Sequence, residues 1–279
     1  MAKLFDFQQV IHNVPELLAY LPITLELAVL SMVIGLLLGL VLAIIKIKQI
    51  PVLKQLTAIF VSIVRGTPVL VQLYIVYFGV PMFLKHLNRK YGTNLAVADI
   101  PGFVYAVMAL GLNSSAFSSE MIRSALMSVG KGQIEAANAL GMTYGQALRR
   151  IIIPEALTVA LPTIGNSFIS AIKGTSLAFT CAVVEMTAQG KIIGGRNYRN
   201  FEVYCSLAII YWVVTVVIEQ ILKFLEKKLA IPEQVENYVP EAEQSKSTQP
   251  KLSFHLQAGN KLSNAFKAFH IGRGAPKKA

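Results

Sequence analysis

The sequence predicts an all-α polytopic membrane protein with about five transmembrane helices. Of its 279 residues, 54% are hydrophobic and only 15% are charged, and the mean hydropathy is +0.55. Several uncharged runs are long enough to cross a hydrocarbon layer of about 30 Å, which takes roughly 20 helical residues. This composition is far from that of a soluble domain.

The formal net charge is +11, because 26 Lys and Arg residues outnumber 15 Asp and Glu residues. A basic chain can bind nucleic acid, but the bases here cluster in loops and tail, as the positive-inside tendency requires. No clustered aromatic and basic surface is present, so we expect no nucleic-acid partner. Cys181 and Cys205 lie in apolar surroundings and imply neither a disulfide framework nor a metal site.

The N-terminal part predicts an interfacial helix followed by the first span. Residues 5–22 alternate apolar and polar side chains, which is typical of a short amphipathic helix at the membrane surface. Residues 27–45 carry no charge, and Lys46 closes this run. Gly35 and Gly39 have the G-x-x-x-G spacing of a face on which another helix can pack closely.

The second span begins after Lys54, carries a break at Gly66 and Pro68, and continues to Pro81. Arg65 lies eleven residues past Lys54, about 16 Å along a helix. An arginine at that depth is costly unless it is paired or near water. Arg65 is therefore either a side chain that reaches back to the interface or an elbow or gate residue beside the break.

The third and fourth spans each place an asparagine near mid-bilayer. The spans open at Pro101 and Pro154, and an asparagine follows each proline by twelve residues, about 18 Å along a helix. Polar groups at that depth either bond a neighbouring helix or line a solute path, and both possibilities stay open here. The polar candidates for a path in these two spans are Asn113, Ser114, Asn166 and Ser170.

The fourth apolar run is longer than one straight crossing and is interrupted at Lys173 and Gly174. This predicts a helix that ends near Lys173 and a partly inserted segment that continues to about Val184. Non-helical backbone at membrane depth is tolerated only where protein or a water-filled cavity surrounds it. Because such breaks in transporters often face the substrate route, Lys173 and Thr175 are further candidates for the path.

A polar loop over residues 185–202 leads to the fifth span, 203–218, which extends to about Leu222. Five spans put the termini on opposite sides. The charge bias favours an outside N-terminus and a cytoplasmic tail, and this bias depends on the bases of the tail itself. The tail holds four acids and no base over 230–244, then seven bases and no acid over 245–279. Its basic half predicts either an amphipathic helix on an anionic membrane surface or a disordered segment.

A polar, helix-prone island separates the third and fourth spans. Residues 133–140 predict a short helix with Ile134, Ala137 and Leu140 on one side. Gly141 stands where a glycine ends a helix. The island therefore begins as a helix followed by a tight turn.

The second half of the island predicts another helix. Thr143 and Gln146 have the spacing of a capping box. The helix is expected to run through Arg149 and Arg150 and to end before Pro154, because this proline biases Ile153 away from the α conformation. A shallow surface would let the backbone of another protein come close. The small residues that keep this surface shallow are Ala136, Ala137 and Gly141.

No catalytic arrangement is visible in the sequence. No histidine has another histidine or a cysteine three or four residues away, and no G-x-x-x-x-G-K-[ST] loop or nucleophile elbow is present. We therefore expect no catalytic residue, metal or cofactor in this chain. The four histidines are His12, His86, His255 and His270.

The island carries a family resemblance. Glu135-Ala136-Ala137, then Gly141, then Ile151-x-Ile153-Pro154 resembles the EAA loop of permease subunits of ATP-binding-cassette (ABC) importers. That family usually has leucine in place of Ile153.

Two more stretches resemble the polar-amino-acid branch of this family. Arg65–Gln72, RGTPVLVQ, is similar to its RGTP-L-x-Q stretch, and Lys173–Leu177, KGTSL, to its KDTSL stretch. Gly174 replaces the acid of that pattern, which puts recognition of a cationic substrate in doubt. The resemblance covers roughly residues 19–228 and leaves the tail unexplained.

The resemblance implies a type-1 ABC permease fold that pairs with a second copy or a paralogue around a central path. The EAA loop would dock on a cytoplasmic ATPase dimer, which would bind ATP and Mg²⁺. An extracytoplasmic binding protein would deliver the amino acid. The coupling residues so implied are Glu135, a salt-bridge partner of the ATPase, and Ala136, Ala137, Gly141 and Pro154.

Domain organisation and substrate follow as expectations. The chain would comprise an extracytoplasmic interfacial segment (1–22), an ABC transmembrane type-1 domain (19–228) and a cytoplasmic tail (229–279) in a multi-pass cell-membrane protein. The stretches KGTSLAFT, VVEM and NYRNFEVY look like those of the cystine and sulfur-amino-acid permeases of Gram-positive bacteria. Cystine or another polar amino acid is the expected substrate.

Three other hypotheses stay open. Intramembrane polarity and broken helices would also suit an ATP-independent secondary transporter or channel, although such carriers usually have internal repeats and more spans. A membrane-embedded enzyme would need a clustered catalytic set, and none is visible. The tail could have a function of its own. If it is merely disordered, deletion of residues 231–279 should leave uptake intact.

Overall fold

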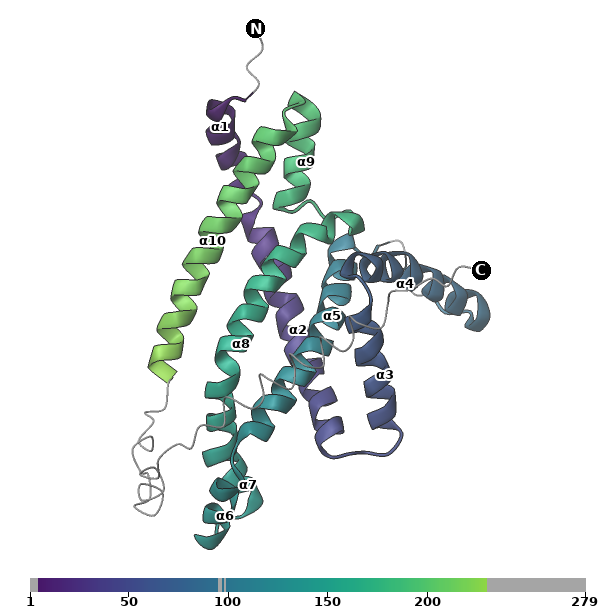
Figure 1. Cartoon of the computed structure of the whole chain (residues 1–279). Coiled ribbons are helices and arrows are strands. Elements are labelled where there is room, and N and C mark those ends of the chain that lie inside the picture. Colours follow the sequence, from purple (N-terminus) through teal and green to yellow (C-terminus); the bar gives the residue numbers. More distant parts are fainter. Residues whose placement is uncertain (1–4, 95–96, 98, 230–279) are drawn as a thin grey trace, which may run out of the picture. The chain divides into compact units, whose positions relative to one another are not determined.

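The structure, a computed structural model, describes residues 5–94, 97 and 99–229. These residues fold into helices joined by short turns, with no strand among them (Figure 1). The long helices are α2 (Leu21–Ile47), α4 (Val69–Tyr91), α5 (Gly102–Ser128), α8 (Ile153–Gly174) and α10 (Asn200–Leu229). The shorter ones are α1 (Phe7–Leu18), α3 (Leu53–Gly66), α6 (Lys131–Ala139), α7 (Tyr144–Ala147), the π-helix η1 (Leu148–Ile152), the 3-10 helix η2 (Thr175–Cys181) and α9 (Met186–Asn197).

The all-α membrane architecture is confirmed. Within the described ranges, four helical stretches are long and apolar enough to cross a membrane: Leu21–Ile47, Val69–Tyr91, Tyr144–Cys181 and Asn200–Lys228. Helix α5 has 27 residues, as many as α2, but its serines and charged last turns make it less apolar. The expected second span is divided into α3 and α4, and α4 continues past Pro81 to Tyr91.

Among the described helices, α2 and α5 make the most extensive contact. A Cβ atom on Gly35 would collide with the Ser114 side chain, and one on Gly39 would lie 2.7 Å from the Ser118 Cβ atom. The G-x-x-x-G face is therefore confirmed as a packing surface. Small residues let the two backbones approach, which matters in lipid because no hydrophobic force drives helices together there.

Helix α1 packs against α9 and the start of α10 (Figure 1). Its buried residues are Val10, Asn13 and Leu17, and the Ser206 hydroxyl of α10 donates to the Val10 carbonyl at 2.8 Å. The expected amphipathic helix is thus present, and its buried side faces protein. Phe7 and Ile11 remain exposed on its other side.

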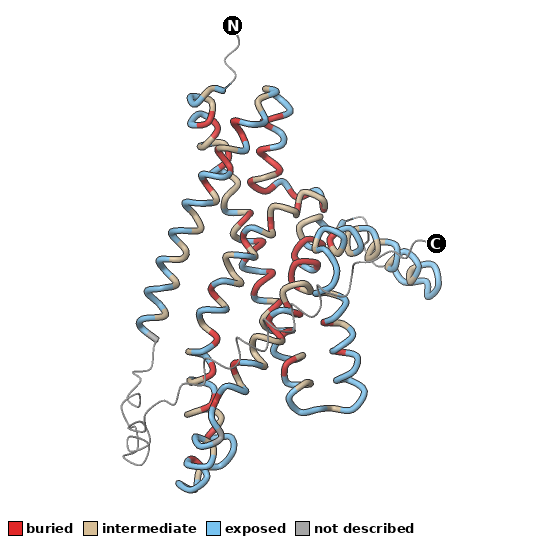
Figure 2. The backbone as a smooth tube through the Cα atoms, in the orientation of Figure 1, coloured by how far each residue is buried: buried red, intermediate tan, exposed pale blue. Residues whose placement is uncertain are grey.

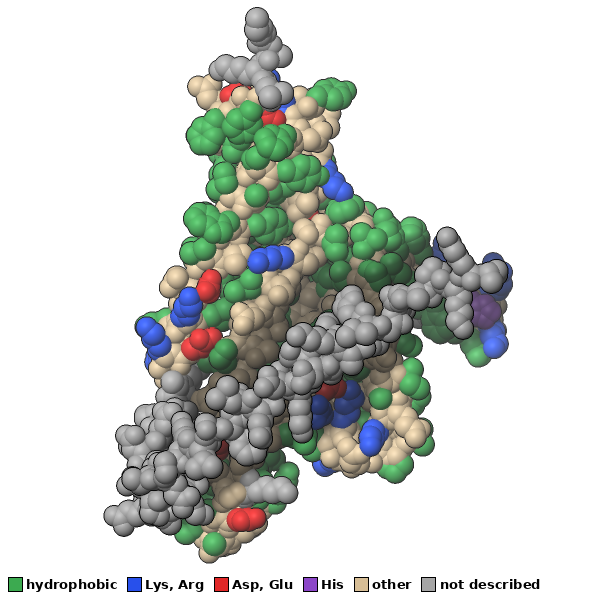
Figure 3. Space-filling model, in the orientation of Figure 1, with side chains coloured by type: hydrophobic (Ala, Val, Ile, Leu, Met, Phe, Trp, Pro, Cys, Tyr) green, Lys and Arg blue, Asp and Glu red, His purple; other side chains and the backbone are tan. Residues whose placement is uncertain are grey.

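Burial is uneven along the helices. Figure 2 shows many buried residues along α2, α5 and α9, whereas α4 buries only Leu73. Apolar side chains gather on the face shown in Figure 3. Among the exposed large apolar side chains are Phe78 of α4 and Trp212 of α10. In a membrane these faces can contact lipid or a neighbouring chain. Residues 1–231 form one compact unit, and the second unit, 232–279, lies outside the described residues, as does the expected tail.

Candidate coupling and translocation sites

The island folds as the sequence predicts, into helix, tight turn and helix. Gly141 has φ +75°, and the Met142 N–H donates to the Ala137 carbonyl at 3.0 Å, which closes the end of α6. At the start of α7 the Thr143 N–H donates to Gln146 Oε1 at 2.9 Å, and the Gln146 N–H donates to Thr143 Oγ1 at 3.4 Å. We call residues 133–147 the knuckle. Figure 1 places α6 and α7 at the end of the helices opposite α1 and α9.

The knuckle exposes only part of the predicted coupling set. Glu135, Ala136 and Gly141 are exposed, whereas Ala137 is buried inside the turn. Nothing lies within 4 Å of a Cβ atom built on Gly141, so the surface around it is open. Ala137 therefore supports the knuckle from within.

Two large apolar side chains also stand out from the knuckle. Leu140 is 77% exposed and Tyr144 is 72% exposed. The helical spacing grouped Leu140 with Ile134 and Ala137 on one side, but Leu140 has turned outward because α6 ends at Ala139. The exposure of apolar side chains on a polar island is the feature that could have identified them as contact residues.

The prediction that the second helix ends before Pro154 is wrong. Ile153 has φ −65° and ψ −48°, which is α-helical, and the helix passes through Pro154 into α8. A proline removes one i→i−4 bond and crowds the carbonyl four residues earlier. The π-helix η1 immediately before Pro154 accommodates this, since the Ile153 N–H donates five residues back to the Leu148 carbonyl.

Arg65 and Asn113 meet at the junction of α3, α4 and α5. The Arg65 guanidinium lies 5.4 Å from the ring centroid of Phe117 on α5. Asn113 Nδ2 donates to Gln72 Oε1 on α4 at 3.0 Å. Ser114, the neighbour of Asn113, faces Gly35 of α2 instead. The structure thus brings Arg65 and Asn113 to one region and Ser114 to a helix contact.

The other path candidates lie on α8 and η2. Asn166, Ser170 and Lys173 are exposed and share one side of α8 by helical spacing, and Ser170 Oγ donates to the Asn166 carbonyl at 2.9 Å. Thr175 is buried, and its hydroxyl donates to the Ile172 carbonyl at 2.7 Å. The expected interruption after Lys173 is a change from α8 to the tighter helix η2.

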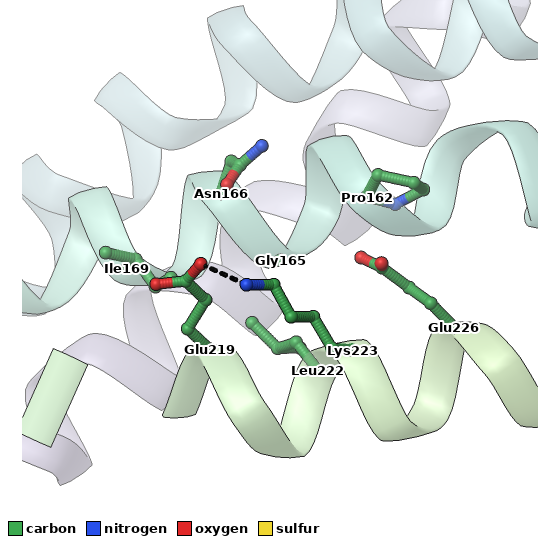
Figure 4. A pocket seen from close by; sticks show the side chains of 8 residues that line it. All are labelled: Pro162, Gly165, Asn166, Ile169, Glu219, Leu222, Lys223 and Glu226. Carbon is green, nitrogen blue, oxygen red and sulfur yellow. Dashed lines mark ion pairs between the residues drawn. The ribbon is translucent and has the colours of Figure 1, made fainter. Parts of the chain in front are cut away.

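A pocket lies between α8 and the C-terminal part of α10. Lys223 Nζ and Glu219 Oε1 form an ion pair at 2.8 Å within it. Figure 4 shows the Asn166 side chain on the opposite side of α8 from this ion pair. The lining residues are Pro162, Gly165, Asn166, Ile169, Glu219, Leu222, Lys223 and Glu226.

Glu185 is a buried carboxylate that the sequence did not single out. It follows the apolar stretch that ends at Cys181 and caps α9, accepting from the Thr187 and Ala188 N–H groups at 2.9 Å each. The Thr24 and Tyr211 hydroxyls each donate to it at 3.4 Å. Burial raises the pKa of Glu185 above its usual value, although these hydrogen bonds oppose the shift. A glutamate directly before a short helix was the available clue, but glutamate is not a usual N-cap residue.

A charge cluster joins the neighbouring ends of α2 and α5. Glu120 pairs with Arg123 at 3.0 Å, as their spacing allows, and also with Lys46 at the end of α2. Within the described ranges, no group of three or more His, Cys, Asp or Glu residues could hold a metal ion.

Comparison with known proteins gives consistent matches. The family model described as binding-protein-dependent transport system inner membrane component matches residues 35–231. The chain is 40% identical over 227 residues to the probable amino-acid permease protein YxeN of Bacillus subtilis, covering 81% of this chain and 97% of that protein. It is also 40% identical over 229 residues to the L-cystine transport system permease protein TcyL of Bacillus subtilis, covering 82% and 93%.

A solved structure, described as an amino acid ABC transporter with histidines, has the same fold. It superimposes with a TM-score of 0.68 at 36% sequence identity, and the match covers 81% of this chain and all of that chain.

Proposed function

This chain belongs to the family of binding-protein-dependent transport system inner membrane components, and from that premise we propose a task for each site described above. The protein is the membrane-spanning permease subunit of an ABC importer for an amino acid. The observation that carries the residue assignments is the knuckle, an exposed helix–turn–helix at one end of the spans. It gives this permease a surface through which another protein can move it.

The knuckle is the coupling surface for a cytoplasmic ATPase subunit, and ATP and Mg²⁺ bind to that partner. Glu135 supplies a charge for a salt bridge, and Gly141 lets the partner's backbone approach. Leu140 and Tyr144 add apolar area that docking would remove from water. Movement of the knuckle reaches α5 and α8, the two helices that flank it in sequence.

Co-purification tests this assignment. A Gly141→Asp variant places a side chain at φ +75°, on the open surface, and we expect it to lose the ATPase subunit during purification. Gly195→Asp is the matched control, because Gly195 has open space around it and lies on α9, far from the knuckle in sequence. Retention of the ATPase by Gly141→Asp would remove the knuckle from the coupling role, and uptake that persists without ATP would exclude an ABC importer.

The remaining partners and the path are part of the same proposal. A second permease copy or a paralogue completes the path, with Arg65, Asn166, Ser170 and Lys173 as path or gate residues. An extracytoplasmic binding protein delivers the substrate at the end of the molecule that carries α1 and α9.

Cystine is the substrate that we propose. Its support is the similarity to a permease named for L-cystine and the KGTSL stretch, in which Gly174 stands in place of an acid. Uptake of labelled cystine, arginine and glutamine should be compared in the assembled transporter. We expect cystine to be taken up fastest, and absence of cystine uptake together with rapid arginine uptake would contradict the assignment.

A further inference from the structure

The break between α3 and α4 leaves backbone carbonyls without their helical donors. Pro68 has no N–H, so the carbonyl of Val64, four residues earlier, loses the donor that a continuous helix would provide. The Ile63 carbonyl is met by the Thr67 hydroxyl at 2.9 Å. Water is scarce at membrane depth, so an unmet carbonyl is strongly destabilising there.

The side-chain amide of Gln72 fills the gap at Val64. Gln72 Nε2 donates to the Val64 carbonyl at 2.8 Å, and it also lies 2.8 Å from Thr67 Oγ1 and 3.1 Å from the Thr67 carbonyl. An amide nitrogen carries two hydrogens and no acceptor, so these partners fix the orientation of the amide. Its oxygen then faces α5, where it accepts from Asn113 Nδ2 at 3.0 Å.

A second contact holds the same break to α5. The Arg65 guanidinium lies over the ring of Phe117, 5.4 Å from its centroid. Phe117 is four residues after Asn113, so the two anchor points are one turn apart on the same side of α5. Helix α5 ends at Ser128, and the knuckle follows after four residues.

From these contacts we propose that Gln72 is a positioning residue, which clasps the α3–α4 break to α5 so that both move together when the knuckle is displaced. The proposal rests on the uptake function proposed above. It assigns Asn113 to the clasp. Neither side chain then needs to touch the substrate, so loss of the clasp should lower the maximal uptake rate and leave the KM for the amino acid unchanged.

A double-mutant cycle in the reconstituted transporter, complete with its ATPase subunit, tests the clasp. Gln72→Met keeps the side-chain length and removes both hydrogen-bonding functions, and Asn113→Leu removes the other partner. Gln220→Met, an exposed glutamine of α10, is the matched control. We expect each single variant to lower maximal uptake about tenfold relative to the control while ATP hydrolysis continues. The double variant should also lose about tenfold, because both changes break one unit.

Several outcomes would overturn the clasp. One is a double variant whose maximal uptake falls about a hundredfold, as expected of two independent sites. The others are a raised KM in either single variant, and uptake by Gln72→Met equal to that of the control. If Gln72→Met does not accumulate in the membrane, Gln72→Glu decides, because a carboxylate can accept from Asn113 but cannot donate to Val64. Full uptake by Gln72→Glu would overturn the proposal, and an about tenfold loss would support it. Absence of uptake by the wild-type transporter would instead count against the proposed function.

Discussion

At the scale of single residues, the lack of space for a Cβ atom on Gly39 determines which residues the α2–α5 contact can accept. A Cβ atom there would lie 2.7 Å from the Ser118 Cβ atom and 3.0 Å from the Ser119 nitrogen. Gly39→Val should therefore separate α2 from α5 and cost about 1–3 kcal/mol of stability, the usual range for overpacking. Thermal unfolding in detergent measures this. Gly79→Val, at a glycine of α4 with nothing within 4 Å of its Cβ position, should unfold close to the wild-type temperature. Equal losses in both variants would mean that the α2–α5 contact is looser than described.

Glu185 gives a second prediction at this scale, for pH. Its pKa in the folded protein lies above 4.5, the ordinary value for Glu, because it is buried. The folded protein therefore holds this proton more tightly than the unfolded chain. Tighter proton binding by Glu185 therefore adds to the free energy of unfolding in full below about pH 4.5. This contribution is lost as the pH rises through the pKa of Glu185 in the folded protein.

The unfolding temperature of the wild-type protein should therefore fall as the pH rises above about 4.5, and in Glu185→Gln it should fall less steeply. Melting curves between about pH 4 and 8 measure the slope. Gln133→Asn, at an exposed amide of α6 that carries no titratable group, is the control and should keep the wild-type slope. A Glu185→Gln variant that also keeps it would show that another group causes the pH dependence.

At the scale of elements, the sequence predicts features whose two partners are close along the chain. Gly141 and the Thr143–Gln146 box could be predicted because each interaction closes within five residues. The Gly66–Pro68 break was equally local, since these residues themselves interrupt a helix. The Gln72–Asn113 bond joins residues 41 apart and depends on how α4 meets α5, so no local pattern indicates it. Glu185 was missed for the same reason, because Thr24 reaches it from 161 residues away.

The error at Pro154 has a local cause and leads to a prediction. The rule that a proline ends the preceding helix assumes a regular α-helical turn, and η1 provides a wider π-turn instead. Deleting Ile151 should convert η1 into an ordinary α-helical turn and so restore the crowding between the Pro154 ring and the carbonyl four residues before it.

The helix should then kink at Pro154, and the kink would tilt the knuckle relative to α8. We expect the chain to insert in the membrane and uptake to fall to background. Ile151→Ala keeps the residue count and should retain most uptake. Normal uptake by the deletion variant would show that the orientation of α7 is not set by η1.

At the scale of the whole molecule, the positions of the basic residues predict the orientation of the chain in the membrane. Lys46 at the end of α2 pairs with Glu120 near the end of α5, which leads directly into the knuckle. Further basic residues stand at the α2–α3 and α7–α8 connections. They are Lys48, Lys54, Arg149 and Arg150. Bases near the ends of spans favour the cytoplasmic side, so the knuckle should lie inside and α9 outside.

Thiol labelling from one side of the membrane tests this orientation. Cys181 is buried and Cys205 is half-buried, so both are replaced by alanine to give a background without labelling. Tyr198→Cys, at a position 89% exposed just after α9, should react with a membrane-impermeant reagent in intact cells. Gln133→Cys, exposed on the knuckle, should react only after the cells are permeabilised. The reverse pattern would place the knuckle outside, where it could not meet a cytoplasmic ATPase. The coupling role of Glu135 and Gly141 would then fail with the orientation, because both depend on the same side of the membrane.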